Sequence, residues 1–239
     1  FWQKNIGIQC LAISPDQKCF CFGGKEGIYV WRRENDRWSS LEGNASPVTC
    51  LKISEDGKKA VSGSKDGRLQ YWDISREQLV SDWSAHQGMV TDLAITSDGM
   101  LALTSSVDGS IRCWDLGKRE CIMQSQQKSR PLLSLSIAHK NHTTLMSGGL
   151  DGSIRQWSMG TGLCHNLIKA HPYPITSLFL HKDGTTVLSG DQQGVMKLWN
   201  LEMRKCLGSI EAHEEAITQV MLSPDGQWDF SSSKEHYGK

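Results

Sequence analysis

Short apolar hexamers recur along the chain, and turn-forming residues follow each of them. The hexamers occupy residues 8–13, 48–53, 90–95, 132–137, 175–180 and 217–222, and most contain several β-branched residues. The turns after them include SEDG at 54–57, TSDG at 96–99 and SPDG at 223–226. A six-residue apolar run between turn residues is typical of a strand and too short for a helix, and Asp-Gly pairs favour tight hairpin turns. The pattern therefore predicts an all-β chain without helices.

A tryptophan recurs at a nearly constant interval beside these hexamers. Trp31, Trp72, Trp114, Trp157 and Trp199 are separated by 41, 42, 43 and 42 residues, and a short run ending in Gly precedes each of them. Each repeat then predicts four antiparallel strands, which in the second repeat cover roughly 48–53, 58–64, 67–74 and 78–83. One such sheet cannot bury both of its faces alone, so the repeats are expected to stack side by side.

The period, the Ala-His dipeptides at 85–86, 170–171 and 212–213, and the Trp-Asp dipeptides at 72–73 and 114–115 resemble WD40 repeats. The resemblance implies a single WD40 β-propeller domain over 1–239, with about five complete four-stranded blades and a partial sixth. The expected repeats are roughly 1–41, 42–83, 84–126, 127–168, 169–210 and 211–239. Because rings of this family usually have seven blades and the chain starts with Phe1, we expect a segment of a seven-bladed ring cut from a longer polypeptide.

The resemblance also implies a hydrogen-bonded tetrad of His, Ser or Thr, Asp and Trp in each blade. Carried over by position, only the third repeat is complete, with His86, Ser106, Asp108 and Trp114. The second repeat has Asn44, Ser64, Asp66 and Trp72 at these positions, and the sixth has His213, Ser233 and Glu235. The fourth keeps Asp151 and Trp157 but has Lys128 near the His position and Gly149 at the Ser position. The fifth keeps His171 and Trp199 but has Gln193 where Asp is expected.

A His-Ser-Asp set can also be a catalytic triad. Here the spacing repeats with the fold, the tryptophan belongs to the set, and no nucleophile elbow accompanies it. We interpret the tetrads as structural and predict no catalytic residues and no enzyme activity.

Charge and cysteine content narrow the classes of partner and compartment. The chain has 26 basic and 26 acidic residues, so no nucleic-acid or membrane-surface partner is predicted, and no apolar run is long enough to span a bilayer. The eight cysteines contain no C-x-x-C pair, and Cys121, Cys164 and Cys206 each fall seven residues after a repeat tryptophan, as small apolar fillers would. We expect a reduced protein in the cytoplasm or nucleus. Neither Cys19-x-Cys21 nor His139-x-x-His142 supplies a convergent metal-ligand set, so no metal or cofactor is predicted.

The resemblance further implies that partners dock on one face, lined by the loops that join strand four to strand one and strand two to strand three. In the third and fourth repeats the corresponding positions are mostly apolar: Met89, Thr91, Val107, Pro131, Leu133 and Leu150. Two interpretations stay open. These side chains form an exposed contact surface, or they pack inside the loops.

The leading prediction for function is a non-catalytic scaffold that presents a rigid propeller face to protein or peptide partners. The alternatives are a regulatory or sensor module, or the substrate-recognition part of a ubiquitin ligase, within a larger protein. The Trp-Asp-x-Arg motif linked with one ligase adaptor is absent, because DIS, DLG, SMG and NLE follow the third-strand tryptophans from Trp72 onward. This absence disfavours the ligase alternative.

Overall fold

The computed structural model describes residues 7–126, 130–137 and 144–234. These residues form five four-stranded antiparallel sheets and one two-stranded sheet. The all-β prediction is confirmed, and the fold is that of a WD40 propeller with five complete blades and a partial sixth. No helix among the described residues is long and apolar enough to cross a membrane.

The chain divides into two compact units, of which unit 1 comprises residues 1–108 and 112–122, and unit 2 comprises residues 109–111 and 123–239. Blades are numbered here in chain order, and blades 1 to 3 belong essentially to unit 1. Their strands are β1 (Ile8–Ile13), β2 (Cys19–Gly24), β3 (Gly27–Arg32), β4 (Arg37–Leu41), β5 (Val48–Ile53), β6 (Lys59–Ser64), β7 (Arg68–Asp73), β8 (Gln78–Ser84), β9 (Val90–Ile95), β10 (Leu101–Ser106), β11 (Ile111–Asp115) and β12 (Glu120–Gln124).

Blades 4 to 6 belong to unit 2. Their strands are β13 (Leu132–Ile137), β14 (Thr144–Gly149), β15 (Ser153–Ser158), β16 (Cys164–Lys169), β17 (Ile175–Leu180), β18 (Thr186–Asp191), β19 (Val195–Asn200), β20 (Lys205–Glu211), β21 (Ile217–Leu222) and β22 (Asp229–Ser233).

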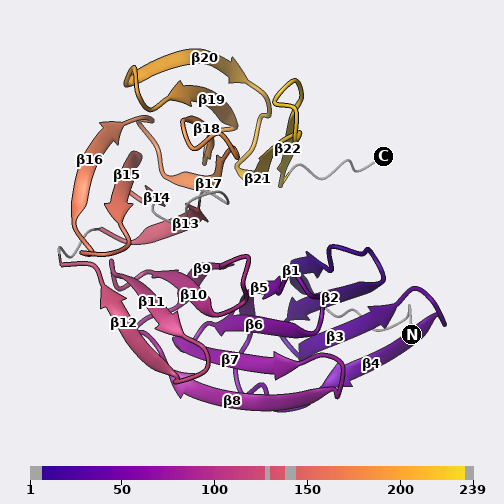
Figure 1. The fold of residues 1–239 in the computed structure, drawn as a ribbon. Coiled ribbons are helices and arrows are strands. Elements are labelled where there is room, and N and C mark those ends of the chain that lie inside the picture. Colours follow the sequence, from indigo (N-terminus) through magenta and orange to yellow (C-terminus); the bar gives the residue numbers. More distant parts are fainter. Residues whose placement is uncertain (1–6, 127–129, 138–143, 235–239) are drawn as a thin grey trace. The chain divides into compact units, whose positions relative to one another are not determined.

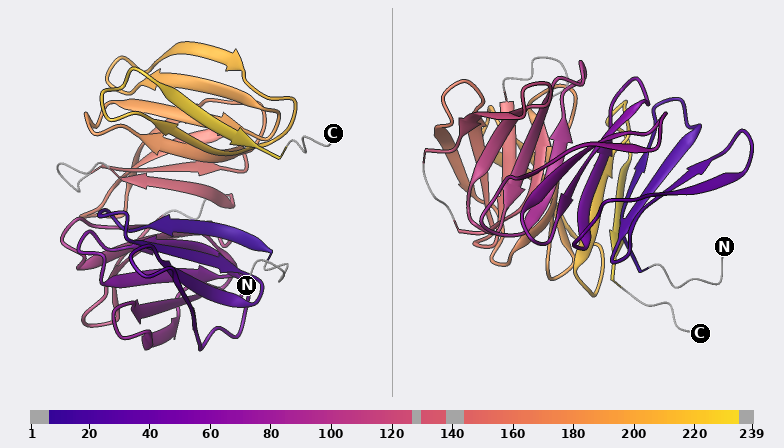
Figure 2. Two further views of the ribbon diagram at one scale, coloured as in Figure 1. Left: turned by 90° about the vertical axis from the view of Figure 1, so that its right-hand side faces the viewer. Right: turned by 90° about the horizontal axis from the view of Figure 1, so that it is seen from below.

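Within each unit the blades stack through their first strands. Strand β5 contacts both β1 and β9 in unit 1, and β17 contacts both β13 and β21 in unit 2. In each complete blade, Figure 1 shows the fourth strand (β4, β8, β12, β16 or β20) on the outer edge of its unit and the first strand on the opposite edge of the sheet. In the two views of Figure 2 the strands of one blade lie side by side as a twisted sheet. The hairpin order β1-β2-β3-β4 recurs in every complete blade.

A Ser/Thr-x-Asp turn closes the first hairpin of most blades. The hydroxyl of Ser54 donates to the Asp56 carboxylate at 2.5 Å, and that carboxylate accepts the backbone N–H of Lys58 at 3.0 Å. The same bonds recur at Thr96 with Asp98 and at Ser223 with Asp225. Gly57 has a φ of 70°, in the left-handed region that glycine adopts without a steric cost. The Asp-Gly pairs of the sequence therefore act as hairpin closures.

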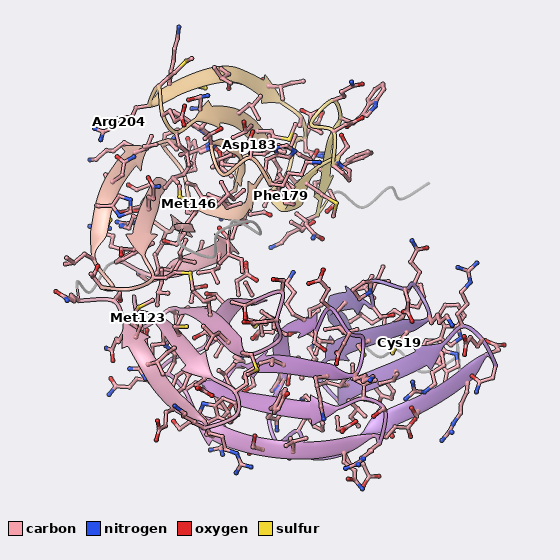
Figure 3. All side chains as sticks on the ribbon, in the orientation of Figure 1. Cys19, Met123, Met146, Phe179, Asp183 and Arg204 are labelled. Atoms are coloured by element: carbon pink, nitrogen blue, oxygen red, sulfur yellow. The ribbon has the colours of Figure 1, made fainter. Side chains whose placement is uncertain are left out.

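The third-strand tryptophans of blades 2, 3 and 5 pack against the preceding blade. Trp72 is fully buried in a cluster with Cys21 and Val30 of blade 1. Trp199 joins Met146 of blade 4 in the corresponding cluster of unit 2. Met146 and Phe179 lie among the inner strands of unit 2 (Figure 3). The recurring tryptophan therefore fills the space between two sheets.

Each first strand contains a β-bulge near its start. In blade 2 the register passes from Val48 to Cys50 and leaves Thr49 unpaired. The Thr49 hydroxyl donates to the carbonyl of Val90 in the next blade at 2.5 Å, and Thr176 does the same to Ile217 at 2.5 Å. These threonines connect neighbouring blades within each unit.

All eight cysteines are free thiols. The prediction that Cys121 is a small apolar filler is wrong, because its side chain is exposed on the outer strand β12. Cys164 and Cys206, at the same repeat position, are only partly buried. An outer strand has no further strand of its blade beside it, so this repeat position is exposed or partly buried, and of the three only Cys206 packs against a core cluster, the one that contains Trp199.

Candidate functional site: blade tetrads and loop face

A continuous hydrogen-bonded relay holds blade 3 together. His86 lies 3.0 Å from the Asp108 carboxylate through Nδ1 and 2.8 Å from Thr104 Oγ1 through Nε2. The indole N–H of Trp114 donates to the same Thr104 oxygen at 3.1 Å. With the proton on Nδ1, each buried polar group of this set has a partner of the right kind.

The prediction that Ser106 supplies the hydroxyl of this tetrad is wrong, because the hydroxyl comes from Thr104, two residues earlier. Thr104 takes the role assigned to Ser106, while Ser106 donates to the Gly88 carbonyl at 3.2 Å and accepts the Asp108 N–H at 3.0 Å. Both side chains lie on the same face of β10, because residues two apart in a strand point to the same side. Ser106 therefore supports the turn that positions Asp108.

Blade 5 has a complete tetrad that the sequence pattern concealed. His171 contacts Asp191 Oδ2 at 2.9 Å and Ser189 Oγ at 2.8 Å, and Trp199 donates to Ser189 at 3.0 Å. The expected position of the aspartate was that of Gln193. The carboxylate comes instead from Asp191, two residues earlier, and it also accepts the backbone N–H of Gln193. Asp191 is fully buried.

The other blades keep only part of the relay. In blade 2 Trp72 donates to Ser62 at 2.9 Å, and the predicted Ser64 instead donates to Asp66 at 2.5 Å. In blade 4 Trp157 donates to Ser147 at 2.9 Å. In blade 6 His213 contacts Ser231 at 2.8 Å, so the predicted Ser233 is again two residues late. Lys128, Glu235 and His139-x-x-His142 lie outside the described residues.

Blade 4 replaces the histidine relay with an ion pair. Arg155, almost fully buried, donates to both carboxylate oxygens of Asp151, with Nη1 at 3.1 Å from Oδ1. Burial raises the pKa of Asp151, but the hydrogen bonds and charge of Arg155 outweigh it, and the pKa lies below its ordinary value. A Cβ on Gly149 would lie 2.7 Å from both Arg155 Nη1 and Asp151 Oδ1. The glycine at the position where blades 2, 3, 5 and 6 carry Ser or Asp therefore leaves room for the pair.

The histidines of both relays are buried, and burial favours the neutral imidazole. Burial lowers the pKa of His86 and of His171, against the opposing effect of their aspartates. The Thr104 hydroxyl is fully buried and already accepts the indole N–H of Trp114. A nucleophile must reach its substrate, so this geometry stabilises the blade and gives no access for a catalytic step.

Sequence reasoning missed an anchor on the third strand of three blades. Gln70, Arg112 and Lys197, two residues before the tryptophan, each donate to the carbonyl 27 residues earlier, at Gly43, Ala85 and Ala170. The Gln70 and Lys197 bonds measure 2.9 and 2.8 Å. A long polar side chain at this position is the signal that could have revealed the anchor. This hydrogen bond holds the loop on which the tetrad histidine, or the residue at its position, lies.

The loop face has one recurring geometry in all blades from 2 to 6. The backbone N–H at the β-turn between strands two and three donates to the carbonyl just before the first strand. The bonds join Lys65 to Pro47, Val107 to Met89, Leu150 to Pro131, Gln192 to Pro174 and Lys234 to Ala216. The side chains at the two ends of each bond therefore lie next to each other. Both are apolar only in blade 3, with Met89 and Val107, and in blade 4, with Pro131 and Leu150.

The predicted face residues differ in their surroundings. Leu150 is 44% exposed, and Met89, Val107, Pro131 and Leu133 are partly exposed. Thr91 is bonded to Ser105 within blade 3 at 3.0 Å, which disfavours it as a contact residue. The six residues divide between the two units, with three in each.

The sequence model of the family described as "WD domain, G-beta repeat" matches this chain five times. The matched residues are 36–73, 77–115, 119–158, 162–200 and 204–237, well over half of the chain. The chain is a WD40-repeat protein. The first four matched WD40 segments each run from the fourth strand of one blade through the third strand of the next, and the fifth begins at β20 and covers β21 and β22.

Three WD40 relatives illustrate how far the likeness extends. An uncharacterised WD repeat-containing protein of Schizosaccharomyces pombe is 31% identical over 85 residues, which is 34% of this chain and 14% of that protein. Periodic tryptophan protein 2 of Saccharomyces cerevisiae is 31% identical over 81 residues, or 32% of this chain and 9% of the relative. Human WD repeat-containing protein 18 is 29% identical over 90 residues, or 30% of this chain and 21% of the relative. The chain thus matches less than a quarter of each relative's length.

WD40 domains generally serve as non-catalytic modules that bind other proteins. Within residues 7–126, 130–137 and 144–234, no three His, Cys, Asp or Glu side chains converge as a metal-binding group. The features that distinguish one blade from another are therefore the loop-face side chains and the departures from the tetrad.

Proposed function

We propose that this chain is a non-catalytic interaction scaffold that binds protein partners through apolar loop side chains, which blade 3 presents in unit 1 and blade 4 presents in unit 2. One observation carries the proposal. The same backbone geometry presents Lys65, Gln192 and Lys234 in other blades but Val107 and Leu150 in these two. Exposed apolar side chains that replace polar ones at a repeated position favour a contact surface.

Unit 2 adds an aromatic residue to this surface that the sequence pattern did not single out. Tyr173 is 48% exposed in the loop before β17. Its carbonyl lies 2.9 Å from where a Cβ of Gly152 would be, so the loop sits against the turn that carries Leu150. Tyrosine is enriched at binding hot spots because its ring buries a large area at a small cost in side-chain entropy. Leu133, in the bulge position where blades 2 and 5 have threonine, lies on the same blade as Leu150.

Photo-crosslinking tests this proposal at matched positions. A crosslinking amino acid replaces Val107 or Leu150 in the apolar pairs, or Lys65 or Gln192 in the polar ones, and the full chain is expressed in cells. We expect one protein partner to crosslink from 107 and 150 and not from 65 and 192. Leu133→Asp then abolishes the crosslink at 150, in the same unit, or weakens it about tenfold or more, while Gln192→Arg leaves it unchanged. Equal crosslinking from all four positions, or an undiminished crosslink at 150 in Leu133→Asp, contradicts the proposal.

We infer that the module acts in the cytoplasm or nucleus as part of a larger protein. A regulatory module and a ligase substrate receptor both fit a rigid loop face, and the identity of the crosslinked partner separates them.

A further inference from the structure

A pocket of about 370 Å³ lies between blades 4 and 5 of unit 2. Blade 5 lines it with Thr185 of the turn between β17 and β18 and with Glu202 and Arg204 of the turn between β19 and β20. Blade 4 lines it with His165 and Asn166 of β16. The turns after the first and third strands lie at the end of the sheet opposite the loop face, so the pocket is separate from the contact surface of the proposed function.

The equivalent place between blades 1 and 2 of unit 1 holds a carboxylate. Glu77 of blade 2 lies there, and its side chain accepts hydrogen bonds from three side chains of blade 1. The donors are Ser39 at 3.0 Å, Arg32 at 3.4 Å and Arg37 at 3.5 Å. The Glu77 side chain is 24% exposed. A carboxylate at this repeat position therefore joins two neighbouring sheets.

Arg204 is the residue of blade 5 that corresponds to Glu77. Each lies five residues after the third-strand tryptophan of its blade, and both have a positive φ, 52° for Arg204 and 56° for Glu77. Asn166 corresponds to Ser39, because each pairs with the residue before the third-strand tryptophan of its own blade. The described lining from blade 4 contains no Asp or Glu. Unit 2 thus has a cation where unit 1 has the carboxylate, and still has a hydrogen-bond donor opposite it.

The donors of this pocket lack an acceptor in the part of the chain that the structure describes. There, the Arg204 guanidinium, the His165 ring and the Thr185 hydroxyl make no side-chain hydrogen bond or ion pair. The Asn166 amide donates only to Gln156, at the long distance of 3.5 Å. Glu202 is the only acid among the described lining residues, and it forms no ion pair with Arg204. The pocket therefore offers several unused donors and one positive charge to a ligand.

We propose that this pocket binds the carboxylate of an aspartate or glutamate side chain in a protein partner. Arg204 supplies a positive charge and paired N–H groups that match a carboxylate, and Asn166 and Thr185 add neutral donors. The buried Leu201 gives the CH₂ groups of the acidic side chain an apolar contact. Glu202 repels a second negative charge, so a singly charged carboxylate fits better than a phosphate monoester, which carries nearly two.

Titration of the ¹⁵N-labelled full chain with Nα-acetyl-glutamic acid α-amide at pH 7 tests the pocket without any partner. We expect saturable shifts of the Thr185 backbone amide, the Asn166 side-chain amide and the Arg204 Nε–H. Nα-acetyl-glutaminamide has a similar shape and no charge, and we expect it to bind at least about tenfold more weakly. We also expect Nα-acetyl-phosphoserinamide to bind more weakly than the glutamate compound.

Three variants make the titration specific. Arg204→Gln removes the positive charge and is expected to weaken binding of the glutamate compound about tenfold or more. Glu202→Gln removes the repulsion and is expected to strengthen binding of the phosphoserine compound about threefold or more. Arg119→Gln changes the residue at the same repeat position in blade 3, and this matched control is expected to leave binding of both compounds unchanged.

Absence of saturable shifts at these three signals, equal binding of the glutamine compound, or full binding by Arg204→Gln overturns the inference. Tighter binding of the phosphoserine compound than of the glutamate compound overturns it as well, in favour of a phosphorylated partner. The inference does not rest on the proposed function. The titration needs no partner on the loop face, so its outcome is independent of crosslinking at 107 and 150.

Discussion

Thr104→Val separates the relay seen in blade 3 from the one expected at Ser106. The substitution keeps the shape of the side chain and removes the hydroxyl that serves both Trp114 and His86. The indole N–H and the imidazole Nε2 then stay buried without a partner, and each loss costs about 1–3 kcal/mol. We expect a loss of about 3 kcal/mol in the unfolding free energy of unit 1. Thr104→Ser keeps the hydroxyl and loses about 1 kcal/mol through the missing methyl group.

Urea unfolding of the full chain, followed by hydrogen exchange of peptides from β10 and β11, assigns this loss to unit 1. Two units need not unfold together, so one global signal would not be sufficient. Ser106→Ala removes two bonds of the turn and is expected to cost about 1–2 kcal/mol. If Thr104→Val costs no more than Ser106→Ala or Thr104→Ser, the hydroxyl of Thr104 does not hold the relay and the reasoning is refuted.

Three further predictions concern the variant blades and pH. His86 and His171 have depressed pKa values in the folded chain, so the unfolded chain binds more protons, and the unfolding free energy should fall as the pH drops below the unfolded pKa of about 6.5 towards the folded pKa values. Urea midpoints between pH 5 and 7.5 measure this fall. An unchanged pH slope in the double variant His86→Gln with His171→Gln would contradict it. Asp191→Asn should destabilise unit 2 by about 2–3 kcal/mol because the carboxylate accepts bonds from His171 and two backbone amides, and Gln193→Asp, which restores the family pattern, should give no gain in thermal unfolding. Gly149→Ser should cost about 1–3 kcal/mol by displacing the Arg155–Asp151 pair, whereas Gly160→Ser, with open space around its Cβ, should be neutral in the same melts.

Much of the fold follows from the sequence because strand period and turn chemistry are local properties. Asp-Gly turns and six-residue apolar runs place the strands, and the tryptophans mark one register position in each blade. The identity of the tetrad hydroxyls cannot be predicted from the sequence in the same way. Residues two apart lie on the same face of a strand, so a period of two does not distinguish Thr104 from Ser106. Asp191 was missed for the same reason, since its register position holds Ser64 in blade 2 and Ser106 in blade 3.

The surroundings of individual side chains are harder to predict, because the sequence does not show which hydrogen bonds a side chain makes or lacks in the folded chain. Asn44 occupies a histidine position, and only the three-dimensional arrangement shows that its buried amide makes no hydrogen bond to the part of the chain that the structure describes. Tyr173 shows no repeat pattern, so its exposure beside the Leu150 turn emerges only from the packed loops.

The bulge threonines have a consequence for how the chain opens. A bond from Thr176 to the first strand of the next blade makes the opening of one blade more costly while its neighbour stays closed, so fluctuations are shared along the unit. Blade 4 has Leu133 at this position, and leucine has no hydroxyl to give to blade 5. Leu133 therefore lacks this bond, although the Ser136 hydroxyl of blade 4 accepts the backbone N–H of Leu180 in blade 5 at 2.9 Å. Under the proposed function, a partner packed on Leu133 would add contacts at this position and slow local unfolding of unit 2.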